Sequence, residues 1–112
     1  MNHDGHTFQI ASEQRGEDNF VKLSGSITID SSPGLRRVLL RMLKAPGSRR
    51  LTLDFSGVDY IDTSGLAVLI EALRSARQLS KSLKLSGLRE RPRYLLESTG
   101  LLRLFEEAPA KQ

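Results

Sequence analysis

The chain has 112 residues, a length typical of one domain with a single modest core. It contains no cysteine, which excludes disulfides and thiolate metal sites, and its formal net charge is +4. No segment has the pattern of a secretion signal or the length of a membrane-spanning run, so we expect a cytoplasmic protein without membrane insertion.

The first half of the chain predicts two paired strands followed by a helix. Residues 8–13 and 19–26 are short β-type runs, and the polar, Gly-containing stretch between them suits a hairpin. A serine before Pro33 marks the start of a helix, in which leucines follow at helical spacing until Pro46-Gly47. Basic residues take the other side of this helix, which therefore lies at the surface.

The second half alternates strands and helices. Residues 51–55 alternate between apolar and polar, which predicts a strand, and Ser56-Gly57 are expected to turn the chain after it. Residues 64–80 carry the clearest helical pattern. The last elements are predicted as a short strand, a short helix and an edge strand, at residues 84–86, 92–98 and 101–105.

This order of elements predicts an α/β sandwich with right-handed crossovers between parallel strands. We expect a four- to five-stranded mixed sheet with about three to four helices, in one domain spanning residues 1–112. Its core covers roughly residues 8–105, and both termini are expected to be flexible. The basic residues follow the polar faces of the predicted helices, which favours solvated surfaces over a nucleic-acid site.

The richest polar stretch lies between the strand at 51–55 and the helix at 64–80. In such a sheet, functional groups gather in loops at the carboxyl ends of strands, where helix N-termini also point. The hydroxyls of Thr63 and Ser64 stand at such a terminus, where a phosphate would be stabilised by the positive helix end. The spacing alone favours ordinary helix capping by Asp62, Thr63 and Ser64, with Gly65 easing the turn.

Residues 54–69, from Asp54-Phe55-Ser56-Gly57 to Ala67-Val68-Leu69, resemble the signature block of STAS-domain anti-sigma factor antagonists. Residues 23–27 resemble the Gly motif of the family's second strand, and residues 98–105 its C-terminal Gly-Leu element. The resemblance implies a STAS-like sandwich that works as a binding module, with no enzymatic activity, no cofactor and no metal. It also implies a partner, an anti-sigma factor that is itself a Ser/Thr kinase.

The same resemblance implies a phosphorylation switch. The kinase phosphorylates the hydroxyl residue directly after the loop aspartate, here Thr63, with Ser64 as the fallback, and the phosphorylated form no longer holds the kinase. The unphosphorylated form frees a sigma factor and so regulates transcription, and a phosphatase would reset the switch. The implied partner surface comprises Asp62, Thr63, Ser64, Gly65, Leu66, Ser24, Ser26 and Thr28.

A second function compatible with the same domain is that of a STAS subunit in a lipid-transport ABC complex. There the same loop would dock onto an ATPase or a permease instead of a kinase. The basic charge and Thr63 are compatible with this second function.

Catalysis and phosphoacceptor chemistry are less well supported by the residues. The only histidines, His3 and His6, stand in a predicted flexible terminus, so no base is available to activate a nucleophile. Asp54, Asp59 and Asp62 could form the acidic cluster of a response-regulator receiver, but that fold needs an acidic pair after its first strand, and residues 10–13 supply none. We therefore expect a binding function.

Overall fold

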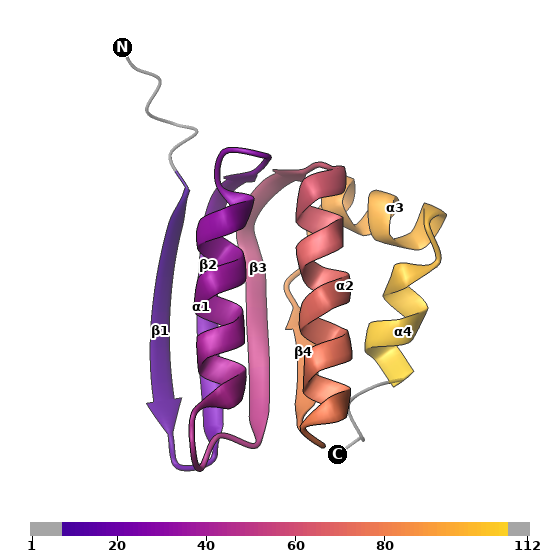
Figure 1. Ribbon diagram of the computed structural model, residues 1–112. Helices are drawn as coiled ribbons and strands as arrows, with labels where there is room; N and C mark the ends of the chain where they lie inside the picture. The colour runs from indigo at the N-terminus through magenta and orange to yellow at the C-terminus, as the bar shows by residue number, and fades with distance from the viewer. Residues whose placement is uncertain (1–7, 108–112) are drawn as a thin grey trace.

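The computed structural model describes residues 8–107, whose strands form one four-stranded sheet in the order β1-β2-β3-β4 (Figure 1). The first two strands are antiparallel, whereas β2, β3 and β4 run parallel to one another. The strands are β1 (Gln9–Arg15), β2 (Asp18–Ile27), β3 (Arg50–Ile61) and β4 (Ser82–Ser86).

Within residues 8–107, four helices complete the fold, and two of them lie side by side on one face of the sheet (Figure 1). These two follow β2 and β3, and the two shorter helices follow β4. The helices are α1 (Ser32–Lys44), α2 (Thr63–Gln78), α3 (Glu90–Ser98) and α4 (Leu101–Glu107). The predicted α/β sandwich with a mixed sheet is confirmed. None of the helices in the described range combines the length and hydropathy needed to cross a bilayer.

Strand β3 is longer than the alternation of its sequence suggested. Its buried residues are spaced by two up to Phe55 and by three afterwards, at Val58 and Ile61. The register with β2 shifts at two places in this stretch, which identifies two β-bulges. The prediction that the strand ends at residue 55 was therefore wrong, because each bulge inserts one residue and restores the inward direction of the next apolar side chain.

Gly57 belongs to this bulged strand and does not turn the chain as predicted. A Cβ at Gly57 would lie 2.8 Å from the Cβ of Ser24 and 2.9 Å from the carbonyl oxygen of Leu23. Only glycine allows β2 and β3 to approach this closely.

Helix α4 replaces the edge strand predicted at residues 101–105. Gly100 ends α3 as expected, with a φ of 79° and its N–H donating to the carbonyl oxygen of Glu97 at 3.1 Å. Leu101, Leu102 and Phe105 are buried, because one face of a helix brings all three onto the core, whereas a strand would turn neighbouring residues to opposite faces. The ends predicted to be flexible are residues 1–7 and 106–112. Of these, residues 106 and 107 form the end of α4, and the others lie outside the described range.

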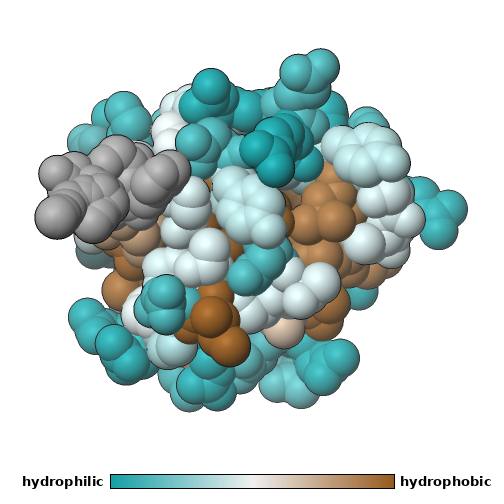
Figure 2. Space-filling view, turned by 90° about the horizontal axis from the view of Figure 1, so that it is seen from above, coloured by the Kyte–Doolittle hydropathy of each residue, from teal (hydrophilic) through white to brown (hydrophobic). Residues whose placement is uncertain are grey.

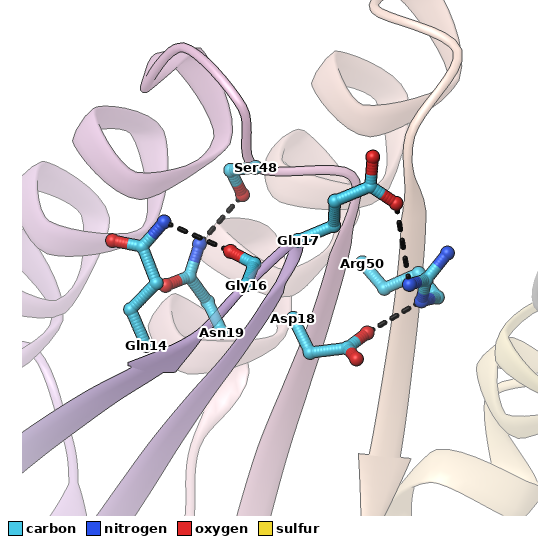
Figure 3. A network of polar contacts seen from close by, with 7 residues as sticks. All are labelled: Gln14, Gly16, Glu17, Asp18, Asn19, Ser48 and Arg50. Carbon is cyan, nitrogen blue, oxygen red and sulfur yellow. Dashed lines mark hydrogen bonds and ion pairs between the residues drawn. The ribbon is translucent and has the colours of Figure 1, made fainter.

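Polar contacts close the end of the sheet that carries the β1–β2 turn (Figure 3). The side-chain amide of Asn19 donates to the Ser48 hydroxyl at 2.6 Å, and both residues are buried. Arg50 on β3 pairs with Asp18 and, at 3.5 Å, with Glu17. The hairpin is thereby tied to the α1–β3 connection and to the start of β3.

Candidate functional site

The carboxyl ends of β2 and β3 meet at one edge of the sheet, at the end of the molecule seen in Figure 2. Asp62 is the single residue between β3 and α2, and its backbone N–H donates to the carbonyl oxygen of Ile27 at 3.0 Å. The polar loop expected here is therefore mostly strand, and Thr63 is the first residue of α2.

Asp62 is the N-cap of α2. One of its carboxylate oxygens accepts from the N–H groups of Ser64 and Gly65, at 2.9 and 3.2 Å, and from the Ser64 hydroxyl at 2.5 Å. These hydrogen bonds hold the pKa of Asp62 below its usual value, and the bond from the Ser64 hydroxyl has the largest effect. The capping interpretation is thus correct for Asp62, and the Ser64 hydroxyl is engaged in the cap.

Thr63 is in a different situation from Ser64. Its side chain is exposed, whereas Ser64 is half-buried. Within residues 8–107 no hydrogen bond is found for the Thr63 hydroxyl, which stands at the positive end of the α2 dipole. Of the two adjacent hydroxyls, Thr63 presents the one that a second protein can reach.

Gly65 and Leu66 are buried beneath this turn. A Cβ at Gly65 would lie 2.5 Å from Cγ1 of Ile61 and 2.8 Å from Cγ2 of Ile27. The first turn of α2 therefore packs directly on the strand ends, and these two residues position Asp62 and Thr63 from below instead of facing a partner.

Ser26 and Thr28 lie at the same edge as Thr63, at the end of β2. The Ser26 hydroxyl donates to Asp59 at 3.4 Å. Ser26 and Thr28 border a groove that also contains Arg37 and Tyr60. Ser24 is placed differently: it pairs with Gly57 and lines a separate hollow beside Lys22, on the sheet face that α1 and α2 leave uncovered. The structure brings Ser26 and Thr28, but not the side chain of Ser24, to the edge that carries Thr63.

A second groove, of about 580 Å³, lies beside Thr63 between the end of β3 and α3. Tyr60 borders both grooves, and Arg91 and Tyr94 form part of the far wall of this one. The guanidinium carbon of Arg91 lies 5.2 Å from the centroid of the Tyr60 ring. Figure 2 shows apolar surface exposed between hydrophilic groups at this end of the molecule.

We call the surface formed by Ser26, Thr28, Tyr60, Asp62 and Thr63, together with the two grooves beside it, the Thr63 edge. The sequence did not single out Tyr60, although it stands in the block of residues 54–69. Arg91 and Tyr94 carried no local signal, because only the folding of α3 against β3 brings them to this edge.

The three aspartates of a possible receiver-like cluster have separate roles. Asp54 accepts from the backbone N–H of Ser56 at 2.9 Å, Asp59 accepts from Ser26, and Asp62 caps α2. Among the residues that the structure describes, no group of three or more histidine, cysteine, aspartate or glutamate side chains is arranged to hold a metal ion.

Comparisons with known proteins agree with this fold. A family model described as "Mlab, STAS domain" matches residues 10–106. An anti-sigma-B factor antagonist of Staphylococcus aureus is 32% identical over 91 residues, which cover 80% of this chain and 83% of that protein.

Solved structures give the same answer at lower identity. An anti-sigma factor antagonist from Mycobacterium paratuberculosis matches with a TM-score of 0.80 and 20% identity, over 91% of this chain and 86% of that one. The antagonist SpoIIAA in its unphosphorylated form matches with a TM-score of 0.73 and 16% identity, over 85% and 82% of the two chains. The phosphorylated form of the Bacillus cell fate determinant SpoIIAA matches with 0.69 and 15%, over 87% and 86%. The chain belongs to the STAS-domain family of anti-sigma factor antagonists.

Proposed function

We propose that this protein is an anti-sigma factor antagonist whose Thr63 edge binds an anti-sigma factor, and that phosphorylation of Thr63 by the Ser/Thr kinase activity of that partner ends the binding. The unphosphorylated protein holds the anti-sigma factor and thereby frees a sigma factor for transcription. A phosphatase returns the protein to its binding state. The function is binding, carried out in the cytoplasm without a cofactor.

The observation that carries the proposal is the contrast between the two hydroxyls at the start of α2. A kinase must place the attacking oxygen in line with the γ-phosphate of ATP, so the hydroxyl has to be accessible. Thr63 meets this condition because it is exposed. Ser64 donates its hydroxyl to Asp62, and its phosphorylation would break the N-cap. Thr63 is therefore preferred over Ser64.

The charge of one phosphate is large enough for a switch. Weakening an interface from sub-micromolar to near-millimolar affinity requires about 4 kcal/mol. A phosphate adds about −1.5 to −2 charges, here beside the ionised Asp62, and placing it in an interface fitted to a neutral hydroxyl costs several kcal/mol. The solved forms of SpoIIAA support the proposal, because the same fold accommodates the phosphorylated and the unphosphorylated state.

Capture of partners from an extract of the source organism tests the proposal. The baits are the wild type, Thr63→Ala, Thr63→Glu and, as a matched charge control, Gln78→Glu at the far end of the same helix. We expect the wild type, Thr63→Ala and Gln78→Glu to capture the same anti-sigma factor, and Thr63→Glu to bind the purified partner roughly 100-fold more weakly. Equal binding by Thr63→Glu and the wild type would refute the switch.

Mass spectrometry of the native protein then separates Thr63 from Ser64 as the phosphorylated residue. The identity of the captured proteins also decides between the two functions that the sequence left open. A small ATP-binding kinase indicates sigma-factor control. An ATPase together with membrane proteins, and a Thr63 that is never phosphorylated, indicates a STAS subunit of a lipid-transport ABC complex using the same edge.

A further inference from the structure

The groove beside Thr63 contains charges of both signs. Asp62 contributes a carboxylate next to Thr63, and the start of α3 contributes Glu90 and Arg91. Arg91 is the single cation among the described residues that line this groove. A phosphate on Thr63 would therefore enter a groove with two carboxylates and one guanidinium.

Arg91 is only weakly held where it lies. Its side chain is exposed, and within the described part of the chain its charge forms no ion pair. Its guanidinium carbon instead lies 5.2 Å from the centroid of the Tyr60 ring, a cation–π contact that is weak at an exposed position. A guanidinium binds a phosphate through two parallel, charge-assisted hydrogen bonds, which are each stronger than bonds between neutral groups. The phosphate is thus the better partner.

We propose that Arg91 binds the phosphate of phosphorylated Thr63. Once Thr63 is phosphorylated, the Arg91 guanidinium leaves the Tyr60 ring and forms hydrogen bonds with the phosphate oxygens across the groove. The physiological role of this contact rests on the proposed function, but the contact itself does not. The pairing offsets the repulsion between the phosphate and the carboxylates of Asp62 and Glu90. It also uncovers Tyr60, so phosphorylation changes the shape of the Thr63 edge as well as its charge.

The protonation of the phosphate gives a direct test. Phosphothreonine is installed at position 63 of the full chain by genetic code expansion, so that no kinase is needed, and the second pKa of the phosphate is followed by ³¹P NMR. A nearby cation favours the dianion and lowers this pKa. Arg91→Ala is therefore expected to raise the pKa of the phosphate by roughly half a pH unit, and Arg91→Lys by less.

Arg93→Ala is the matched control, because Arg93 lies on the same helix but faces Glu97 at 4.0 Å instead of the groove. It is expected to leave the pKa of the phosphate unchanged. Circular dichroism is used to check that each variant keeps its fold. If Arg91→Ala shifts the pKa of the phosphate no more than Arg93→Ala does, Arg91 does not bind the phosphate.

A second readout follows the Tyr60 contact. In the unphosphorylated protein the ring should shift the side-chain proton resonances of Arg91, and this shift should disappear with phosphothreonine at position 63. Persistence of the ring-current shift would overturn the proposal. Both readouts work without a partner protein. A failure at Arg91 therefore leaves the Thr63 switch standing, and a failure of partner capture leaves the Arg91 contact testable.

Discussion

The two ends of the sheet differ in how their polar groups are satisfied. At the hairpin end, Asn19 and Ser48 bond to each other in a buried position and Arg50 pairs with two acidic neighbours. At the Thr63 edge, an exposed hydroxyl stands beside two grooves with no partner among the described residues. Polar side chains that form hydrogen bonds or ion pairs with each other contribute to stability, whereas polar side chains without such a partner are available to bind another molecule. Substitutions at the two ends should therefore separate stability from binding.

Gly65→Ala should have the largest effect on stability. It would sharpen the comparison, because a loss of stability would show that Gly65, although it lies beneath the Thr63 edge, is a structural residue. The added methyl would meet the side chains of Ile61 and Ile27 at 2.5 and 2.8 Å. We expect the free energy of unfolding, measured by urea titration, to fall by about 2–3 kcal/mol from overpacking.

Gly34→Ala is the control for this substitution, since Gly34 lies inside α1 and the nearest atom to its added methyl would be 3.8 Å away, at the end of the Arg37 side chain. It should raise the free energy of unfolding by about 0.5–1 kcal/mol, because alanine restricts the unfolded chain more than glycine does. An equal loss of stability in both variants would show that the packing of α2 on the strand ends is not the cause.

Asn19→Ala should affect stability alone. It leaves the buried Ser48 hydroxyl without its partner, so the free energy of unfolding should fall by about 2 kcal/mol. Gln14→Ala removes an exposed bond of 3.2 Å to the carbonyl oxygen of Gly16 in the same network and should change it by less than about 0.5 kcal/mol. Partner capture should be unaffected by both, and loss of capture in the correctly folded Asn19→Ala variant would break the distinction between the two ends.

Asp62→Asn should have the smallest effect, visible in the pH dependence of stability. Asparagine can still cap α2 but cannot ionise. Because the folded pKa of Asp62 is depressed, chiefly by the Ser64 hydroxyl, its charged form adds stability that is fully present above the unfolded pKa of about 3.9 and is lost as the pH falls through the folded value.

The difference in free energy of unfolding between the wild type and Asp62→Asn is therefore expected to be constant near neutral pH and to shrink below about pH 4. Other carboxyl groups with a lowered pKa, such as that of Asp54, contribute equally to the stability of both proteins, so their effects cancel in this difference. A difference that stays constant down to pH 3 would show that the Asp62 charge does not contribute to the cap.

The order of the elements from β1 to α3 could be predicted from local patterns, because helix and strand periodicities are visible in short windows of sequence. Two parts could not be predicted in this way. The length of β3 depends on two bulges, which exist only in its pairing with β2. Residues 101–107 form α4 because Leu101, Leu102 and Phe105 can reach the core together only from a helix.

In the candidate site, too, some features could be predicted from local sequence and others could not. Asp62, Thr63 and Ser64 were identified as a polar helix start from adjacent residues, and the structure places them in one turn. Tertiary structure alone decided which hydroxyl is exposed, that Gly65 and Leu66 lie in the core, and that Arg91 faces Tyr60 across a groove. The reason is physical: capping and periodicity act over a few neighbouring residues, whereas exposure and grooves depend on elements that meet only after the sheet has formed.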